Sequence, residues 1–566
     1  MASSINASPT WPQGQLPGLS ALASLDLDRS TVAITLAAIV ILPLLVSYIA
    51  SSLRGEKVPV VNPPGRFQTA LQKSIEFGTA GFKIFQQAQE QFPNQPFKLL
   101  SNAGYTTILP PDRALEVKQH PNLSFRKAFS TVCNYCAGLL PSPVVIIPFT
   151  FKHAVRVKIL PASSEGAAAL GVLDHPSEII QKIVTKHLTK RLNSVTAPLS
   201  LETSVATDKN FGKSSEWTEI KVYEPITDVI ARVSSRVFLG DKLCRDAAWL
   251  DITKSFAQTA MAVIMTMRAF PTWIRPLVFQ FASYGKEYRA LYRRGHNAIM
   301  PIMKERQEER TECAAKGVPA PVYNDLIEWA ETEAGNNSFD MTAVQLSISM
   351  AAIHTTSDLV SQNILWLSTR PDFVDALRKE MIEVLPAKGW KKTSLTSLRL
   401  LDSAIKEAQR LKPTSVSGMQ RLVMKDTVLE GGITLRKGEY SAVDATRVWD
   451  PKLHKNPDEF DIYRFYEARK QPGGEHVHQL VSTSPDHIAF GLGKYACPGR
   501  FFASNETKVV LCHLLLKYDW KLAEGSSTDF TYFGTELSIN PEAKVLYRRR
   551  KEEFDLDALA TDEEAS

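Results

Sequence analysis

The longest uninterrupted hydrophobic stretch of the chain lies near its start. Residues 31–50 carry no charge and consist mostly of alanine, isoleucine, leucine and valine. An α-helix rises about 1.5 Å per residue, so this stretch would span about 30 Å, the thickness of a hydrocarbon core. It starts late and lacks a small-residue cleavage site, which favours one transmembrane anchor over a cleaved signal peptide. Residues 1–30, rich in serine, alanine and proline, are expected to form a disordered tail.

Basic residues flank this stretch unevenly. Three of them follow it by residue 66, whereas Arg29 is the only one before it. The positive-inside rule therefore places the body of the protein, residues 66–566, on the cytosolic side. The linking residues 51–65 are rich in proline, which cannot continue a helix, so they predict a stiff hinge between anchor and globule.

Hydrophobic residues recur at helical spacing through most of the body. A stretch of about 30 residues reads as one long helix that ends before Arg370-Pro371. Shorter β-like runs follow, one of them interrupted by Gly431-Gly432, which suits a hairpin. The pattern predicts a mainly α fold with a small β-sheet. The clearest elements are helices over 340–369, 371–384 and 400–411, and strands over 421–424 and 428–435.

Composition narrows the class of protein only a little. The formal charge of +6 is small for 566 residues, and no basic run accompanies a recognition module, so nucleic-acid binding is not expected. A mildly basic surface suits anionic lipid or an acidic protein partner. The six cysteines are too scattered for a disulfide framework and indicate a reducing compartment. Cys133 and Cys136 lack the second pair that a zinc site needs, so two ordinary thiols are expected.

Cys497 stands in the most distinctive loop of the chain. From Phe490 to Arg500 the sequence reads Phe-Gly-Leu-Gly-Lys-Tyr-Ala-Cys-Pro-Gly-Arg. The glycines let the main chain turn sharply and approach a flat partner closely. Pro498 suits the first turn of a helix, which the apolar run after it predicts. A cysteine at a helix N-terminus favours the thiolate, and a thiolate at the tip of a tight loop suits an axial bond to iron.

Four residues of this loop, Phe490, Gly493, Cys497 and Gly499, match the haem-binding signature of the cytochromes P450, the haem-thiolate monooxygenases. The chain resembles this family from residue 66 to about 550. The resemblance implies the cytochrome P450 fold, with haem b between two helices. It also implies that Cys497 is the axial ligand of the iron and that Gly491 belongs to the same cofactor-binding loop.

Two residues of the loop depart from the family pattern. Tyr495 occupies the place where an arginine or histidine commonly binds a haem propionate. Lys494 can supply the missing charge, and the tyrosine hydroxyl can supply a hydrogen bond. Arg421, and His153 together with Arg156, are further candidates for the propionates. A solvated helix face is the plainer interpretation of the His153 pair.

The stretch 351–356, Ala-Ala-Ile-His-Thr-Thr, resembles the oxygen-activating motif of the family. Ala351 and Thr355 are four residues apart and share one face of the predicted helix. Small residues there would let the helix lie against a macrocycle. The resemblance implies that the Thr355 hydroxyl helps to deliver protons to bound dioxygen. His354 stands where an acidic residue usually precedes the threonine, and it either relays protons near neutral pH or simply packs.

Glu407 and Arg410 lie three residues apart on the predicted helix 400–411 and match the ExxR motif of the family. A third motif aligns Arg464 as their expected partner. The resemblance implies a buried structural ion pair that locks the helix to the segment before the cysteine loop. Breaking a buried pair costs about 3–5 kcal/mol, because one charge is left without its partner.

The resemblance implies an enzyme that inserts oxygen from O2 into an apolar small molecule or oxidises it further. No glycine-rich dinucleotide fingerprint follows a predicted strand, so a separate NADPH-dependent flavoprotein reductase is the expected electron donor. The chain is most similar to fungal microsomal members that oxidise terpenoids, indole alkaloids or polyketides in secondary metabolism. This implies a single-pass protein of the endoplasmic reticulum membrane, with a lumenal tail, lipid contacts and a cytosolic catalytic domain. A haem-thiolate isomerase or dehydratase that works without a reductase is the alternative, and NADPH dependence separates the two.

Three other stretches carry weaker expectations. Met261 to Leu277 is rich in methionine, phenylalanine, tryptophan and proline and is expected either to pack in the core or to dip into the membrane at a substrate entrance. The glycosylation sequon at Asn336 should stay unmodified on the cytosolic side. Residues 548–551 are basic and are expected to belong to a solvated tail.

Overall fold

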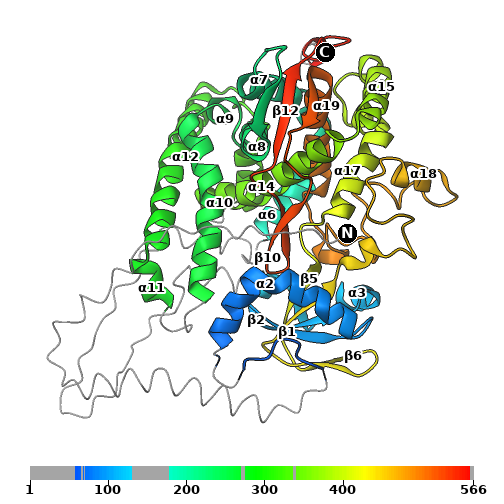
Figure 1. Ribbon diagram of the computed structural model, residues 1–566. Helices are drawn as coiled ribbons and strands as arrows, with labels where there is room; N and C mark the ends of the chain where they lie inside the picture. Colours follow the sequence, from blue (N-terminus) through cyan, green and yellow to red (C-terminus); the bar gives the residue numbers. More distant parts are fainter. Residues whose placement is uncertain are drawn as a thin grey trace, which may run out of the picture.

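The computed structural model describes residues 58–65, 68, 70–129, 178–268, 275–335 and 339–560 (Figure 1). No helix within these ranges is long and apolar enough to cross a membrane. Several predictions concern positions outside the described residues: the tail 1–30, the anchor 31–50, most of the hinge 51–65, Cys133, Cys136, His153, Arg156 and Asn336.

The long helix α14 (Met341–Leu367) runs through the middle of the helical part of the molecule (Figure 1). The Asp340 side chain caps its N-terminus by accepting a hydrogen bond from the Ala343 amide at 3.0 Å. Pro371 then starts the next helix. The predicted helix over 340–369 is thus confirmed. The helices that pack against α14 are α8 (Tyr223–Leu239), α10 (Ala247–Arg268), α12 (Ser283–Lys316), α13 (Leu326–Ala334), α15 (Pro371–Lys388), α17 (Arg399–Leu411) and α19 (Arg500–Lys517).

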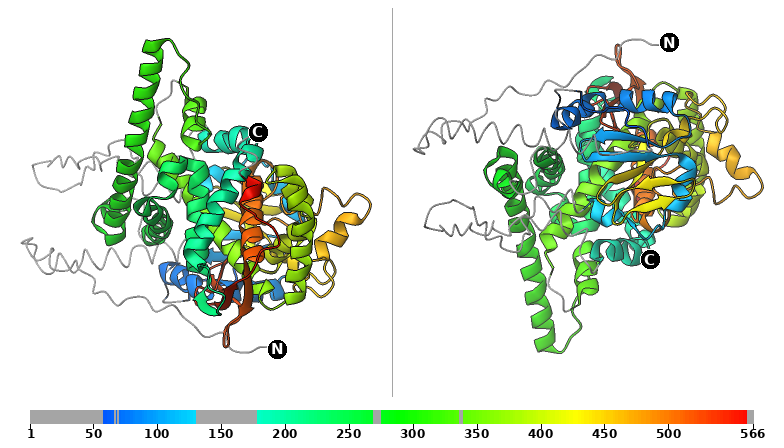
Figure 2. Two further views of the ribbon diagram at one scale, coloured as in Figure 1. Left: turned by 90° about the horizontal axis from the view of Figure 1, so that it is seen from above. Right: turned by 90° about the horizontal axis from the view of Figure 1, so that it is seen from below.

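The other helices surround this group. Seen from above and below, α12 projects from one side of the molecule, and the view from below shows the blue and yellow strands in front of the helices (Figure 2). The remaining helices are α2 (Ala70–Gln91), α3 (Ala114–Val117), α6 (Ile179–Lys182), α7 (Leu192–Phe211), α9 (Asp241–Cys244), α11 (Arg275–Phe281), α16 (Lys392–Ser397) and α18 (Arg464–Lys470). Short 3-10 turns cover Pro111–Arg113, Thr446–Trp449 and Gly493–Tyr495, and a π-helical turn covers Ile183–Leu188.

The largest sheet joins three strands from the N-terminal part of the described chain with two strands from its later part. Its strand order is β1-β2-β8-β5-β3, and β2 pairs in parallel with β8, more than 300 residues later in the sequence. The sequence predicted β5 but missed β1 and β2, because every residue of β1 is buried and shows no polar alternation. The strands are β1 (Phe97–Ser101), β2 (Gly104–Leu109), β3 (Leu123–Ser124), β5 (Ser417–Val423) and β8 (Tyr440–Asp444).

Three smaller strand groups complete the fold. The predicted hairpin is present as β6 (Thr427–Leu429) and β7 (Ile433–Leu435). Gly431 and Gly432 turn it with φ of +81° and +78°, which only glycine adopts readily. The other strands are β4 (Thr218–Lys221), β9 (Tyr518–Leu522), β10 (Phe530–Phe533), β11 (Glu536–Ile539) and β12 (Lys544–Arg549).

The last residues of the proline-rich hinge bind to the sheet. The Val61 amide donates to the Lys98 carbonyl at 3.0 Å. Asn62 exchanges two side-chain hydrogen bonds with the backbone of Leu100, at 3.0 and 2.8 Å. Residues 58–62 are therefore fixed along β1.

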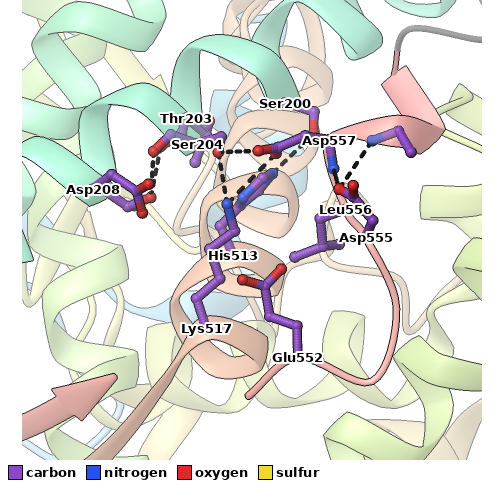
Figure 3. A network of polar contacts seen from close by, with 12 residues as sticks. Ser200, Thr203, Ser204, Asp208, His513, Lys517, Glu552, Asp555, Leu556 and Asp557 are labelled. Atoms are coloured by element: carbon purple, nitrogen blue, oxygen red, sulfur yellow. Dashed lines mark hydrogen bonds and ion pairs between the residues drawn. The ribbon is translucent and has the colours of Figure 1, made fainter. Parts of the chain in front are cut away.

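The expectation that residues 548–551 form a solvated tail is wrong. Arg548 and Arg549 belong to β12, and Arg549 pairs with Asp208 at 2.7 Å, because the chain returns onto α7. The segment that follows is tied down as well: Ser204 accepts a hydrogen bond from the buried Lys517 at 2.6 Å and donates one to Asp557 at 2.8 Å (Figure 3). These contacts fasten the C-terminal segment to α7 and α19.

Candidate functional site

The cysteine loop has a defined turn before α19. Gly491 and Gly493 have φ of +71° and +72°, in the left-handed region that favours glycine. A Cβ at Gly493 would also lie 2.9 Å from Cβ of Lys118, so a side chain there has no room. The Cys497 amide donates to the Phe490 carbonyl at 2.8 Å and closes the loop. The sequence motif thus forms one compact turn that presents Cys497.

The Cys497 sulfur is free and set at the start of a helix. Gly499 is the N-cap of α19, which begins at Arg500. The sequence suggested that Pro498 lies in the first helical turn. In the structure it instead precedes the cap. Burial raises the pKa of the Cys497 thiol, while the amides of Gly499 and Arg500 hydrogen-bond to the sulfur and act in the opposite direction. A bound metal cation would complete the stabilisation of the thiolate.

Helix α14 has an open strip in its middle, formed by Ala351 and Thr355. Ala351 and Thr355 are exposed, whereas most of the helix is buried. The Thr355 hydroxyl donates to the Ala351 carbonyl at 2.8 Å, so it stays on that strip. A small residue and a hydroxyl four positions apart leave room for a flat group. The prediction that these two residues share an open face agrees with the geometry.

The neighbouring His354 turns away from the strip. Its Nε2 lies 3.2 Å from the Lys254 carbonyl, which can only accept, so Nε2 carries the proton. Its Nδ1 lies 3.1 Å from the Tyr223 hydroxyl and accepts from it. Burial lowers the pKa of His354, which keeps the ring neutral. Of the two interpretations left open for His354, this geometry favours packing, with the ring joining α14 to α8 and α10.

The surroundings of Arg421 show whether the residues of the site fit a haem group. Its guanidinium is buried, and no carboxylate of the described chain pairs with it. Its Nε has no hydrogen-bond partner within those residues, and burial lowers its pKa to about 10. The guanidinium lies 4.9 Å from the ring of Tyr495 and 5.7 Å from that of Phe125. A buried cation without an anion fits a ligand that brings a carboxylate, such as a haem propionate.

Lys494 and Tyr495 lie on the same side of the cysteine loop. The Lys494 ammonium is exposed and lies 5.6 Å from the Tyr495 ring. The Tyr495 ring packs 5.7 Å from that of Phe125, a residue that no sequence motif marks. Arg421, Lys494 and Tyr495 therefore form one group, while His153 and Arg156 lie outside the described residues.

The three predicted ion-pair residues meet behind the loop. Glu407 accepts hydrogen bonds from Arg410 Nε at 2.8 Å and Arg410 Nη2 at 2.9 Å, and both residues have no exposed surface. Arg464 Nε adds a third contact to Glu407 at 2.9 Å. Arg410 also donates to the Val448 carbonyl at 2.9 Å. The cluster fastens α17 to the segment around Arg464.

Comparison with known proteins agrees with this geometry. The family model described as Cytochrome P450 matches residues 179–547. Cytochrome P450 monooxygenase hepE of Aspergillus oryzae is 38% identical, covering 88% of this chain and 87% of its own. Cytochrome P450 monooxygenase TRI1 of Fusarium sporotrichioides is 34% identical, covering 87% of this chain and 85% of its own.

The solved structures show the same fold. A cyanobacterial cytochrome P450 with retinoic acid bound, CYP120A1, superposes with a TM-score of 0.60 at 16% identity, covering 87% of this chain and all of that one. The family model spans well over half of the chain, and the fungal relatives cover most of it. The chain therefore belongs to the cytochrome P450 family and is a haem-thiolate monooxygenase.

Proposed function

We propose that this chain is a membrane-anchored monooxygenase of fungal secondary metabolism that oxidises an apolar terpenoid, indole alkaloid or polyketide intermediate. The observation that carries the proposal is that the Cys497 loop precedes α19, which packs against α14, the helix that carries the open Ala351–Thr355 strip. The fungal origin of the relatives, which include Cytochrome P450 monooxygenase eqxH of Fusarium heterosporum, supports the metabolic setting.

Haem, when bound, activates dioxygen for insertion into a C–H bond, and a cysteine thiolate ligand favours O–O cleavage. In this chain Cys497 is the residue that would hold the iron. Arg421, Lys494 and Tyr495 would bind the propionates, and the positive φ of Gly491 and Gly493 would let the main chain of the loop approach the group closely.

Thr355 is the residue of α14 that would orient oxygen and substrate. The Thr355 hydroxyl, held by the Ala351 carbonyl, stands on the open strip and can exchange a hydrogen bond with a molecule there. The ion-pair cluster of Glu407, Arg410 and Arg464 fixes the scaffold behind the cysteine loop.

Residues 31–50 would anchor the protein in the endoplasmic reticulum membrane, with the catalytic domain in the cytosol, where it takes electrons from an NADPH-dependent flavoprotein reductase. The composition of the stretch and the basic residues after it support this orientation. Exposed Met261 in the second half of α10 and exposed Phe281 at the end of α11 suit a contact with lipid at a substrate entrance.

The test is expression of the full chain with a fungal reductase in a host that makes no related metabolites. Candidate terpenoids, indole alkaloids and polyketides are supplied, and extracts are searched for products that have gained one oxygen atom. The proposal expects such a product only when NADPH and reductase are both present. A rearranged or dehydrated product formed without reductase would contradict the proposal and favour an isomerase or dehydratase.

A further inference from the structure

A small cleft lies apart from the residues that would bind haem. Its volume is about 260 Å³, which is room for about nine groups of the size of a water molecule at roughly 30 Å³ each. It lies between α7, α8, α9, α12 and the segment before α13, and none of its lining residues belongs to α14 or to the Cys497 loop. Figure 1 shows α7 and α9 at the end of the molecule opposite β1 and β2. A molecule bound in this cleft is therefore separate from the substrate of the monooxygenase.

The inner wall of the cleft is apolar. It is formed by side chains of α7, α8 and α12, namely Val195, Pro198, Val237, Leu239 and Ile302. All of them except Pro198 are buried. Pro198 stands inside α7 and has no amide hydrogen to donate to the carbonyl of Ser194, another residue of the wall, so that carbonyl lacks its usual helical donor. The wall suits a small hydrocarbon group, with one backbone acceptor beside it.

Most charged groups of the cleft already have partners. The Lys242 ammonium lies 2.7 Å from the Glu305 carboxylate. Arg306 Nη1 donates to Asp325 Oδ1 at 3.0 Å, and the Arg306 guanidinium lies 3.8 Å from the centre of the Tyr323 ring. These contacts neutralise four of the charges within the protein, so they do not select a ligand.

Two further charges of opposite sign line the same cleft. Arg236 is half-buried on α8, and Asp241 is exposed at the start of α9. Neither side chain has a hydrogen-bond or ion-pair partner among the residues that the structure describes. A guanidinium pairs with a carboxylate, and a carboxylate pairs with an ammonium group. A ligand that carries both charges would therefore satisfy both side chains.

We propose that this cleft binds one free α-amino acid with an apolar side chain, such as leucine. The carboxylate of the ligand pairs with Arg236, and its ammonium group pairs with Asp241. The Ser194 carbonyl is a second acceptor for the ammonium group, and the apolar side chain of the ligand packs against the inner wall. The non-hydrogen atoms of leucine are about as many as the water-sized groups that the cleft holds. The proposal is independent of the substrate class and of the proposed metabolic setting.

The first test measures binding of leucine itself. Radiolabelled leucine is dialysed to equilibrium against the purified, haem-loaded full chain, and we expect saturable binding of one leucine per chain. An azole inhibitor that occupies the haem iron should leave this binding unchanged, because no residue of the cleft belongs to α14 or to the Cys497 loop. Absence of saturable binding, or its loss when the azole is added, would overturn the proposal.

The second test uses two analogues that each lack one charge of leucine. Isocaproate lacks the ammonium group, and isoamylamine lacks the carboxylate. Each should compete with labelled leucine at least roughly tenfold less well than unlabelled leucine does, because it loses one charge-assisted contact. Equal competition by either analogue would show that one of the two charges is not recognised, and would overturn the proposal.

The third test changes the two side chains that recognise the charges. Arg236→Met removes the cation and keeps most of the length of the side chain, so leucine affinity should fall at least roughly tenfold. Asp241→Asn should weaken leucine binding but not isocaproate binding, so that the preference for leucine disappears. The matched control is Lys304→Met, which removes an exposed cation of α12 outside the cleft and should leave the affinity unchanged.

Thermal unfolding of each variant shows whether it is folded before binding is measured. Wild-type leucine affinity in a folded Arg236→Met variant would overturn the proposal. An equal loss of affinity in Lys304→Met would overturn it as well, because the effect would then come from the overall charge of the surface. Asp241 is exposed, so Asp241→Asn should fold as the wild type does. A retained preference for leucine over isocaproate in that variant would also contradict the assignment.

Discussion

Replacement of Glu407 by glutamine should destabilise the protein strongly. The carboxylate accepts four hydrogen bonds from Arg410 and Arg464, at distances of 2.8 to 3.1 Å, and both Glu407 and Arg410 have no exposed surface. Glutamine keeps the volume but removes the charge, so the buried Arg410 guanidinium loses its counter-ion. Breaking such a pair costs about 3–5 kcal/mol. That is a large part of the roughly 5–15 kcal/mol that stabilises a typical domain.

The assay is urea unfolding of the haem-loaded full chain, followed by circular dichroism and by the Soret absorbance. The matched control is Glu308→Gln, which breaks an exposed ion pair with Lys304 on α12, where the side chains are 62% and 78% exposed. Such a pair contributes no more than about 0.5 kcal/mol. If the free energy of unfolding of Glu407→Gln lies within about 1 kcal/mol of the wild-type value, the ion-pair cluster does not fix the scaffold and the reasoning is refuted.

Three further substitutions test other parts of the site. Glu506 of α19 is a fully buried carboxyl group whose Oε1 accepts a hydrogen bond from Ser234 at 2.6 Å. Glu506→Gln should stabilise the protein at pH 7, because the raised folded-state pKa of about 8 makes stability fall as pH rises from about 4.5 towards 8. The free energy of unfolding at pH 7 should rise by about 3 kcal/mol at most. If the unfolding midpoint of the variant depends on pH as that of the wild type does, the prediction is contradicted. His354→Phe should keep NADPH coupling within about twofold, since neither ring nitrogen faces the strip; a large rise in hydrogen peroxide would instead indicate a relay. Arg421→Met should lower haem retention, measured as the Soret-to-protein absorbance ratio after gel filtration, because the propionate loses its buried cation. An unchanged ratio would show that other residues hold the propionates.

The sequence predicted the elements whose causes are local. The Asp340 cap, the proline at residue 371 and the pair Gly431-Gly432 each act on their own neighbours, and the corresponding helix ends and hairpin are present. The cysteine loop belongs to the same class, since Gly491 and Gly493 adopt the backbone angles that their residue type allows.

The parts that the sequence did not predict depend on contacts between distant segments. Glu506 stands in an apolar helix, where a glutamate normally faces solvent, and only the packing of Ser234 from α8 shows that it is buried. His354 could relay or pack from its sequence context alone. Its partners Tyr223 and Lys254 lie 131 and 100 residues away, and the contacts with them favour packing. The same reason explains why the docked C-terminal segment was missed, because its partners Asp208 and Ser204 belong to α7.

The claim on which the rest depends is that Cys497 binds the haem iron as a thiolate. The carbon monoxide difference spectrum of the reduced, purified full chain tests it directly, with Cys497→His as the comparison. We predict the red-shifted Soret band of a thiolate-bound iron carbonyl in the wild type and its replacement in the variant by the band of a neutral-ligand haem. A neutral-ligand band in freshly prepared wild-type protein, or an unchanged red-shifted band in Cys497→His, would contradict the assignment of Cys497.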